Sequence, residues 1–233
     1  MSHHVFVTGG TGYIGQALLG ALQARGHTVR ALVRRGSEGR LPNGVPYVLG
    51  DALDAASYVE RIAPADTLVH LVGTPHPSPA KAAEFERVDR VSALAALAAA
   101  RDAGVRHLVY VSVAQPAPVM RAYVAVRAAV EAAIGEAHAA GGPAATILRP
   151  WYVLGPGHRW AHALRPLYAL GRLLPSTRAG AERLGLVTHA EMVQALVQAV
   201  ERPSLGVRIV DVPAIRRARA VAVATPARVA SLS

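Results

Sequence analysis

Residues 6–19 read FVTGGTGYIGQALL, and this stretch decides the fold. An apolar run stops at Thr8, three glycines follow at intervals of three (Gly9, Gly12 and Gly15), and an amphipathic pattern begins. A strand that enters a glycine-rich turn and then a helix brings backbone N–H groups and the positive end of a helix dipole together. In such a turn the first glycine permits the tight bend, the second lets backbone approach a pyrophosphate, and the third lets the helix pack on the strand. The stretch therefore predicts a dinucleotide-binding turn.

The following segments alternate between strand-like and helix-like patterns. Apolar runs predict strands over 4–9, 27–34, 45–51, 66–73, 106–113 and 144–150, and helical periodicity predicts helices over 13–25, 55–62, 80–103 and 120–139. Strands that are apolar on both faces and separated by helices form a parallel sheet covered on both sides. The predicted fold class is α/β, a Rossmann-type doubly wound parallel sheet.

Beyond Pro150 the pattern changes. A loop rich in glycine and aromatic residues is followed by a predicted helix over 161–174, a strand and a helix from about Ala190, and a last strand over 206–212. We expect residues 1–212 to form one NAD(P)-binding Rossmann domain, in which about 150–212 contribute a small C-terminal substrate region. The basic segment 213–233 is expected to be a poorly ordered tail.

Composition excludes several classes of protein. The chain has 233 residues, 52% of them hydrophobic, and it contains neither a run of 18 apolar residues nor a cysteine. We therefore expect a globular, cytoplasmic protein without a membrane span, disulfides or thiolate metal sites. The net charge of +10 comes from arginines scattered along the whole chain, without interleaved aromatic residues, so nucleic acid is not an expected partner.

The motif TGGTGYIG at 8–15 resembles the TGxxGxxG signature of the extended and atypical short-chain dehydrogenases/reductases. The resemblance covers about residues 5–212 and continues in GD at 50–51, HLVG at 70–73, LVYVS at 108–112 and ILRPWYVLGPG at 147–157. It extends to the NAD-dependent epimerase/dehydratase type, and the nearest likeness is to the atypical group of NAD(P)H-binding, NmrA-like and complex I accessory-subunit-like proteins. The resemblance implies cofactor contacts at Gly9, Thr11, Gly12, Tyr13, Ile14, Gly15, Asp51, Leu71, Val72, Gly73 and Pro150.

The end of the second predicted strand bears on the choice of cofactor. An acidic residue there binds the ribose hydroxyls of NAD, whereas arginine suits the 2′-phosphate of NADP. This chain has Arg34 and Arg35, with Glu38 further into the loop. A forked guanidinium meets a phosphate better than a carboxylate does, so NADP(H) is favoured over NAD(H). The alternative is that two of many arginines stand there by composition alone.

The candidate catalytic residues depart from the pattern of the family. Its catalytic members use a tyrosine that exchanges the proton, a lysine four residues later, and a serine that orients the substrate. The matching residues here are Tyr123, Arg127 and Ser112, and Asp89 stands where the family often has Asn. Arginine keeps the positive charge but cannot relay a proton. Two functions remain open: an oxidoreductase or epimerase-like enzyme acting on a small carbonyl or hydroxyl substrate, and a non-catalytic NAD(P)H-binding redox sensor or assembly factor.

Residues near the expected substrate entrance form a last group. Its members are polar or aromatic side chains on loops that follow predicted strands: His76, Trp151, Tyr152, His158 and Trp160. His158 and His162 have the i, i+4 spacing of metal ligands, but no nearby carboxylate or cysteine completes a set. We therefore predict a small-molecule substrate and no metal. The sequence does not indicate which oligomeric state the protein has.

Overall fold

A computed structural model describes residues 1–154 and 184–218 of the protein. Its main sheet contains seven parallel strands in the order β3-β2-β1-β4-β5-β6-β9. Their bounds are β1 His4–Thr8, β2 Thr28–Val33, β3 Tyr47–Leu49, β4 Thr67–His70, β5 His107–Val111, β6 Ala144–Leu148 and β9 Val207–Val210. The order reverses between β1 and β4, and ligands of open α/β sheets bind at the carboxyl ends of strands at such a point. The predicted Rossmann-type sheet is confirmed.

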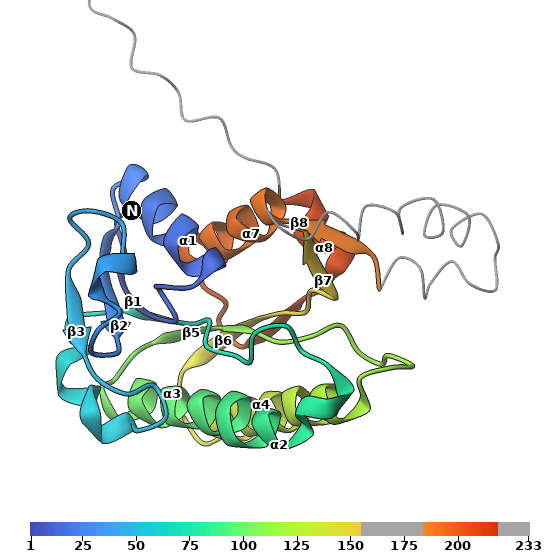
Figure 1. The fold of residues 1–233 in the computed structure, drawn as a ribbon. Coiled ribbons are helices and arrows are strands. Elements are labelled where there is room, and N and C mark those ends of the chain that lie inside the picture. Colours follow the sequence, from blue (N-terminus) through green and yellow to red (C-terminus); the bar gives the residue numbers. More distant parts are fainter. Residues whose placement is uncertain (155–183, 219–233) are drawn as a thin grey trace, which may run out of the picture.

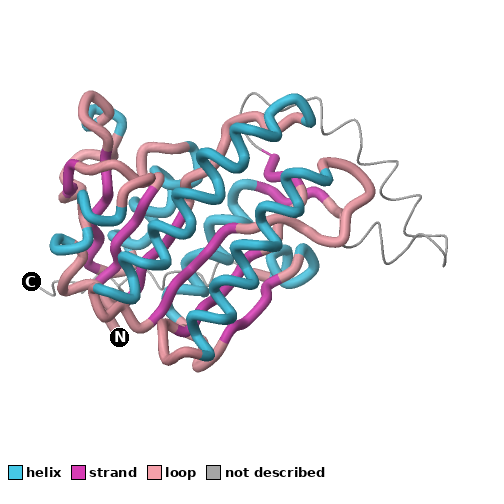
Figure 2. The backbone as a smooth tube through the Cα atoms, turned by 90° about the horizontal axis from the view of Figure 1, so that it is seen from below, coloured by secondary structure: helices cyan, strands magenta, loops and turns pink. Residues whose placement is uncertain are grey.

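Helices cover both faces of this sheet (Figure 1). Helices α1 (Tyr13–Ala24) and α7 (His189–Glu201) pack on one face, around a core that includes Val7 and Val109. Helices α3 (Val91–Asp102) and α4 (Arg121–Ala139) pack on the other face, where they lie alongside each other beneath the strands (Figure 2). Alternate residues of each strand enter the two cores, which is why the strands read as continuous apolar runs.

Two of the predicted helices are wrong in detail. The predicted helix over 80–103 begins with a 3₁₀ turn and the short helix α2 (Ala82–Glu84), continues as a π-helical segment over Phe85–Arg90, and becomes α3. The predicted helix over 55–62 consists of two 3₁₀ turns, Ala55–Ser57 and Val59–Arg61. Local side-chain bonds compete with a helix there, because the Asp54 carboxylate accepts from the Ala56 N–H at 3.1 Å.

A second, two-stranded parallel sheet follows β6. Strand β7 (Tyr152–Leu154) pairs with β8 (Leu186–Thr188), so part of the predicted aromatic loop is a strand. Thr188 then caps α7, since its hydroxyl accepts from the Glu191 N–H at 3.2 Å while the Glu191 carboxylate accepts from the Thr188 N–H at 2.7 Å. The predicted helix over 161–174 lies outside the described residues.

The segment after β9 is helical, which corrects the expectation of a poorly ordered tail from residue 213. Helix α8 spans Val212–Arg217, and the Asp211 carboxylate accepts from the Ala214 N–H at 2.9 Å at its start. Val212 and Ile215 are fully buried against α7 and β8. The local signal for this helix is an N-cap aspartate followed by an i, i+3 apolar pair. It was not recognised because arginines dominate the segment. Residues 219–233 lie outside the described part. Among the described helices, none has the length and apolar character needed to cross a bilayer.

Candidate functional site

The glycine-rich turn at the end of β1 is shaped by close backbone approaches. Gly9 has a φ of 78°, and a Cβ there would lie 2.8 Å from the backbone carbon of Leu71. A Cβ on Gly15 would lie 2.3 Å from the Gly9 oxygen, so the first turn of α1 can approach β1 only without a side chain at this position. Glycine is required at both positions for different reasons.

Gly12 is the N-cap residue of α1 and leaves the N-terminus of the helix open. No side chain caps this end, and no acidic residue stands in the first turn. Among the described residues, the Gly9 oxygen alone, at 3.2 Å, lies within 4 Å of a Cβ built on Gly12. The free N–H groups and the helix dipole therefore face space that a pyrophosphate fits.

Tyr13 and Ile14, the first residues of α1, point in different directions. Ile14 packs against the core, whereas Tyr13 is 45% exposed and contacts His189 at the start of α7. The two ring centroids are 4.0 Å apart, and His189 Nε2 lies 3.3 Å from the Tyr13 carbonyl oxygen. Thr11 precedes the helix, and its carbonyl oxygen accepts from the Gln16 amide at 3.0 Å. Nothing in the sequence pointed to His189 at this site, because only the packing of α1 on α7 brings it to the turn.

The side chains expected at the adenosine end come from neighbouring strands. Arg34 and Arg35 follow β2 and are exposed, and Asp51 follows β3 and is also exposed. The Gly50 N–H donates to the Val33 oxygen at 3.1 Å, which holds the two strand ends side by side. The Asp51 carboxylate itself accepts from the backbone N–H of Leu53 at 3.0 Å.

The segment after β4 links the glycine-rich turn to α4. The Leu71 N–H donates to the Thr8 oxygen at 3.0 Å, and a Cβ on Gly9 would lie 2.9 Å from the Val72 nitrogen. On the other side, a Cβ on Gly73 would lie 2.7 Å from a terminal nitrogen of Arg127. Leu71, Val72 and Gly73 thus lie between the candidate pyrophosphate site and the candidate catalytic residues.

Arg127 is buried and bonded to protein groups. Its side chain forms an ion pair with Asp89, which is fully buried in the π-helical segment. Its second terminal nitrogen donates to the Tyr110 hydroxyl at 3.2 Å and to the Val111 oxygen at 2.9 Å. The other Asp89 oxygen accepts from the Thr74 N–H at 3.0 Å and from the Thr74 hydroxyl at 2.6 Å. Burial raises the pKa of Tyr110 to about 12, although the positive charge of Arg127 opposes that shift.

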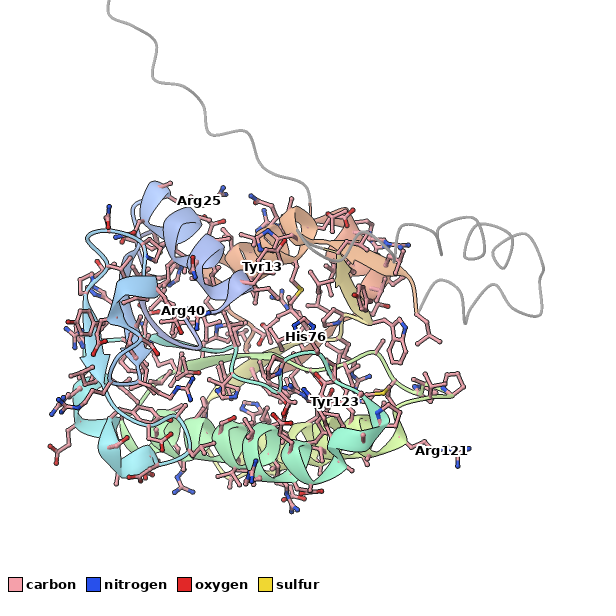
Figure 3. The ribbon with its side chains drawn as sticks, in the orientation of Figure 1. Tyr13, Arg25, Arg40, His76, Arg121 and Tyr123 are labelled. Carbon is pink, nitrogen blue, oxygen red and sulfur yellow. The ribbon has the colours of Figure 1, made fainter. Side chains whose placement is uncertain are left out.

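Tyr123 is half-buried on the first turn of α4. Its ring centroid lies 4.9 Å from that of Phe85 at an interplanar angle of 57°, and the Arg127 Cζ lies 5.0 Å from the Tyr123 centroid. Figure 3 shows Tyr123 on the α4 side and Tyr13 on the α1 side of the molecule, with His76 drawn between them. The phenol thus contacts both an aromatic ring and a cation.

Ser112, just after β5, is 3% exposed and donates its hydroxyl proton to Glu131 of α4. The Gln115 amide donates to the same Glu131 oxygen at 2.7 Å, and Arg149 forms an ion pair with this carboxylate. Glu131 follows Arg127 by four residues on α4, so the two side chains share one face of the helix.

A buried histidine lies beneath the turn. His70 Nδ1 is 2.8 Å from the Thr8 hydroxyl, and its Nε2 is 3.4 Å from the Ser92 hydroxyl. Burial, and then the charge of Arg127, lower the pKa of His70 to about 3. This ring is therefore neutral at physiological pH, and it connects the end of β1 to the helix that follows Asp89.

The expected substrate residues fall into two groups. His76 is exposed on the loop after β4 with a φ of 48°, and Trp151 and Tyr152 are half-buried at the start of β7. Pro150 is buried, and its carbonyl accepts from the Ala114 N–H at 2.9 Å. His158 and Trp160 lie outside the described residues. Within 1–154 and 184–218 no group of three or more His, Asp and Glu side chains has an arrangement that could hold a metal ion.

These features define a nicotinamide-dinucleotide-binding protein of the short-chain dehydrogenase/reductase type. The model of the NAD dependent epimerase/dehydratase family matches residues 5–212, and the chain belongs to that family. It is 36% identical over 175 residues to a "3-diazoavenalumate denitrifying reductase" from Streptomyces sp, covering 74% of this chain and 52% of that protein. It is 32% identical over 217 residues to a "Ceramide reductase" from Caulobacter vibrioides, covering 91% of this chain and 65% of that protein. The chain thus spans about half to two thirds of the length of these curated relatives.

Solved structures share the fold. The UDP-N-acetylglucosamine 4-epimerase from Bacillus cereus superposes with a TM-score of 0.67 at 17% identity, over 90% of this chain and 76% of that chain. The UDP-glucose 4-epimerase of Thermus thermophilus, in complex with NAD, gives a TM-score of 0.63 at 22% identity, over 91% of this chain and 81% of that chain. The expected superfamily and the dependence of the family on a nicotinamide dinucleotide are confirmed.

Proposed function

We propose that the protein is a nicotinamide-dinucleotide-dependent reductase that acts on the carbonyl group of a small molecule, with Tyr123 as the proton donor. The observation that carries the proposal is the Tyr123 phenol, which contacts Phe85 and the Arg127 guanidinium at the sheet end that also carries the glycine-rich turn. Reduction is favoured over epimerisation because the two curated relatives named above are both called reductases.

The cofactor site follows from the elements around the switch point. The open N-terminus of α1 at Gly12 fits the pyrophosphate. The remaining proposed contacts are Gly9, Thr11, Tyr13, Ile14 and Gly15 at the turn, Asp51 at the adenosine end, and Leu71, Val72, Gly73 and Pro150 toward the nicotinamide. Arg34 and Arg35 are exposed at the end of β2, where they support a preference for NADP(H). When bound, the dinucleotide supplies the hydride.

The residues of the chain supply the proton and the orientation. Tyr123 donates its phenolic proton to the substrate oxygen, and the Arg127 guanidinium lies beside it, with its Cζ 5.0 Å from the ring centroid. Ser112 donates its hydroxyl proton to Glu131, so its oxygen is left to accept a hydrogen bond. We propose that Ser112 orients the substrate by accepting a hydrogen bond from a hydroxyl group next to the carbonyl. His76, Trp151 and Tyr152 are the proposed contacts for the rest of the substrate.

The test is a panel of aldehydes, ketones, quinones and nucleotide sugars, with oxidation of NADPH as the readout. We expect one class to be reduced, and Tyr123→Phe to lower its turnover by about 10²–10⁴-fold while nucleotide affinity stays the same. Arg121→Ala, a change at an exposed residue two positions away, serves as the control. Undiminished turnover by Tyr123→Phe would place the chemistry elsewhere.

A non-catalytic NAD(P)H sensor is the second candidate, and a specific observation favours it. Two of the three candidate catalytic side chains are bonded inside the protein, Arg127 to Asp89 and Ser112 to Glu131. A sensor would bind the nucleotide without oxidising it on any carbonyl of the panel. Tight NADPH binding by calorimetry together with no turnover would select this function over the reductase.

A further inference from the structure

The side chains of Asp89 and Arg127 connect two parts of the site that lie far apart in the sequence. Asp89 bonds through one oxygen to Arg127 and through the other to the N–H and hydroxyl of Thr74, at 3.0 and 2.6 Å. Arg127 lies against the backbone of Gly73, where a Cβ would come within 2.7 Å of its terminal nitrogen. The ion pair thus ties the segment after β4, which includes the proposed nicotinamide contact Gly73, to helix α4.

The same pair determines the surroundings of Tyr123. Its ring contacts Phe85, at a centroid distance of 4.9 Å, and the Arg127 guanidinium, whose Cζ lies 5.0 Å from the ring centroid. Phe85 and Asp89 both belong to the π-helical segment, which orients them toward α4. Short π-helical segments of this kind occur frequently at functional sites.

The donors of Arg127 are largely committed to the protein. Both terminal nitrogens donate to protein oxygens, on Asp89, Tyr110 and Val111, and the side chain is 6% exposed. Within the described part of the chain, Nε is buried without a hydrogen-bond partner. A guanidinium bonded in this way is held by Asp89 and the end of β5, because these bonds use three of its five N–H groups, including both on one terminal nitrogen, and its burial shields the others from solvent.

We propose that Asp89 and Arg127 form one positioning unit, which orients Tyr123 and fixes the cofactor-lining segment Gly73–Thr74, and that Arg127 does not act as a direct ligand of the nucleotide. The part that concerns Tyr123 rests on the proposed function; the part that concerns the segment after β4 does not. A buried ion pair that loses one partner leaves an uncompensated charge, which strongly perturbs its surroundings. Changes at either residue should therefore have the same consequences.

The experiment compares Asp89→Asn, Arg127→Lys and Arg127→Met, and the double variant Asp89→Asn/Arg127→Met. Asp89→Asn is isosteric, and Arg127→Lys keeps the charge while losing the bonds to Tyr110 and Val111. The matched control is the exposed pair Arg101 and Asp102 on α3, whose Nε–Oδ1 distance is 3.0 Å, changed to Met and Asn. The readouts are NADPH affinity by calorimetry and hydrogen exchange at the Thr74 amide.

We expect Asp89→Asn and Arg127→Met each to weaken NADPH binding at least tenfold and to speed exchange at Thr74. The double variant should bind no more weakly than the weaker single variant, because the pair acts as a unit. Arg127→Lys should lie between the parent and Arg127→Met. The control changes at Arg101 and Asp102 should alter neither NADPH affinity nor hydrogen exchange at Thr74.

A direct contact between Arg127 and the nucleotide gives a different result and would overturn the proposal. In that case Asp89→Asn would keep its NADPH affinity within twofold of the parent, and Arg127→Lys would bind as the parent does. These readouts need no substrate, so they decide the proposal even if no carbonyl compound is reduced. If a carbonyl compound is reduced, Asp89→Asn should lower kcat more than it raises the KM for that compound, since the change displaces Tyr123 rather than a binding group.

Discussion

Gly12 is the residue at which a single side chain should decide nucleotide binding. A carboxylate in Gly12→Glu would stand at the open N-terminus of α1, in the space proposed for the pyrophosphate, and would repel it. We expect NADPH affinity to fall below detection by calorimetry while the circular dichroism spectrum stays native.

Gly20→Glu is the matched control for this change. Gly20 lies on the exposed side of the same helix, and a Cβ there meets nothing within 4 Å among the described residues. The Gly20→Glu variant should bind NADPH with the same affinity as the parent protein. Unchanged binding by a folded Gly12→Glu variant would contradict the assignment of the turn.

Arg34 and Arg35 should decide between the two dinucleotides. If they bind the 2′-phosphate, the parent protein should bind NADPH more tightly than NADH by about 1.5–3 kcal/mol, the range for hydrogen bonds to charged groups. Replacing both by Ala should remove this difference and leave the NADH affinity unchanged, as measured by parallel titrations. Arg101→Ala, an exposed change at the end of α3, should keep the difference. A parent protein that prefers NADH would show that these arginines are surface charges.

Helix α8 should contribute to stability although its segment has the composition of a tail. Ile215 is fully buried against α7 and β8, so Ile215→Ala should lower the free energy of unfolding by about 2–5 kcal/mol. Arg217→Ala, at an exposed position of the same helix, should change it by less than about 0.5 kcal/mol. Urea denaturation measures both. Equal stability of the two variants would mean that α8 does not pack on the domain in solution.

The fold as a whole should lose stability in mild acid because it buries neutral histidines. Burial lowers the pKa of His70 to about 3 and that of His107 to about 4, from 6.5 in the unfolded chain. The unfolded chain therefore binds protons first, and the stabilisation that is present above pH 6.5 is lost as the pH falls toward 4. Over this window each histidine lowers the free energy of unfolding by up to about 1.4 kcal/mol for each unit by which the pH falls.

Urea denaturation at several pH values tests this expectation. The free energy of unfolding should fall steadily from about pH 7 to about pH 4.5 in the parent protein. The decline should be less steep in His70→Gln, which removes one of the two groups. A flat profile in the parent would contradict the role of buried neutral rings.

Much of the fold was predictable because its signals are local. The spacing of Gly9, Gly12 and Gly15 reflects close approaches within a single strand–turn–helix unit, and alternating apolar segments specify a parallel sheet whatever the partners are. Local composition also misled, since the arginines of residues 213–217 concealed the buried face of α8. The π-helical segment was missed because such segments are rare and occur inside stretches that otherwise have an α-helical pattern.

The candidate site was predictable as a set of positions, not as a set of partners. The i, i+4 spacing put Tyr123, Arg127 and Glu131 on one face of a helix, but the partner of Arg127 is 38 residues away and that of Glu131 is 18 residues away. His189 reaches Tyr13 across 176 residues of sequence. By itself the sequence determined which side chains each element presents to the switch point of the sheet. The tertiary structure alone decided which charges meet there, because ion pairing depends on how α3, α4 and the strand ends pack together. Helical periodicity predicts the face on which a residue lies, but it does not predict which residue of another element that face contacts.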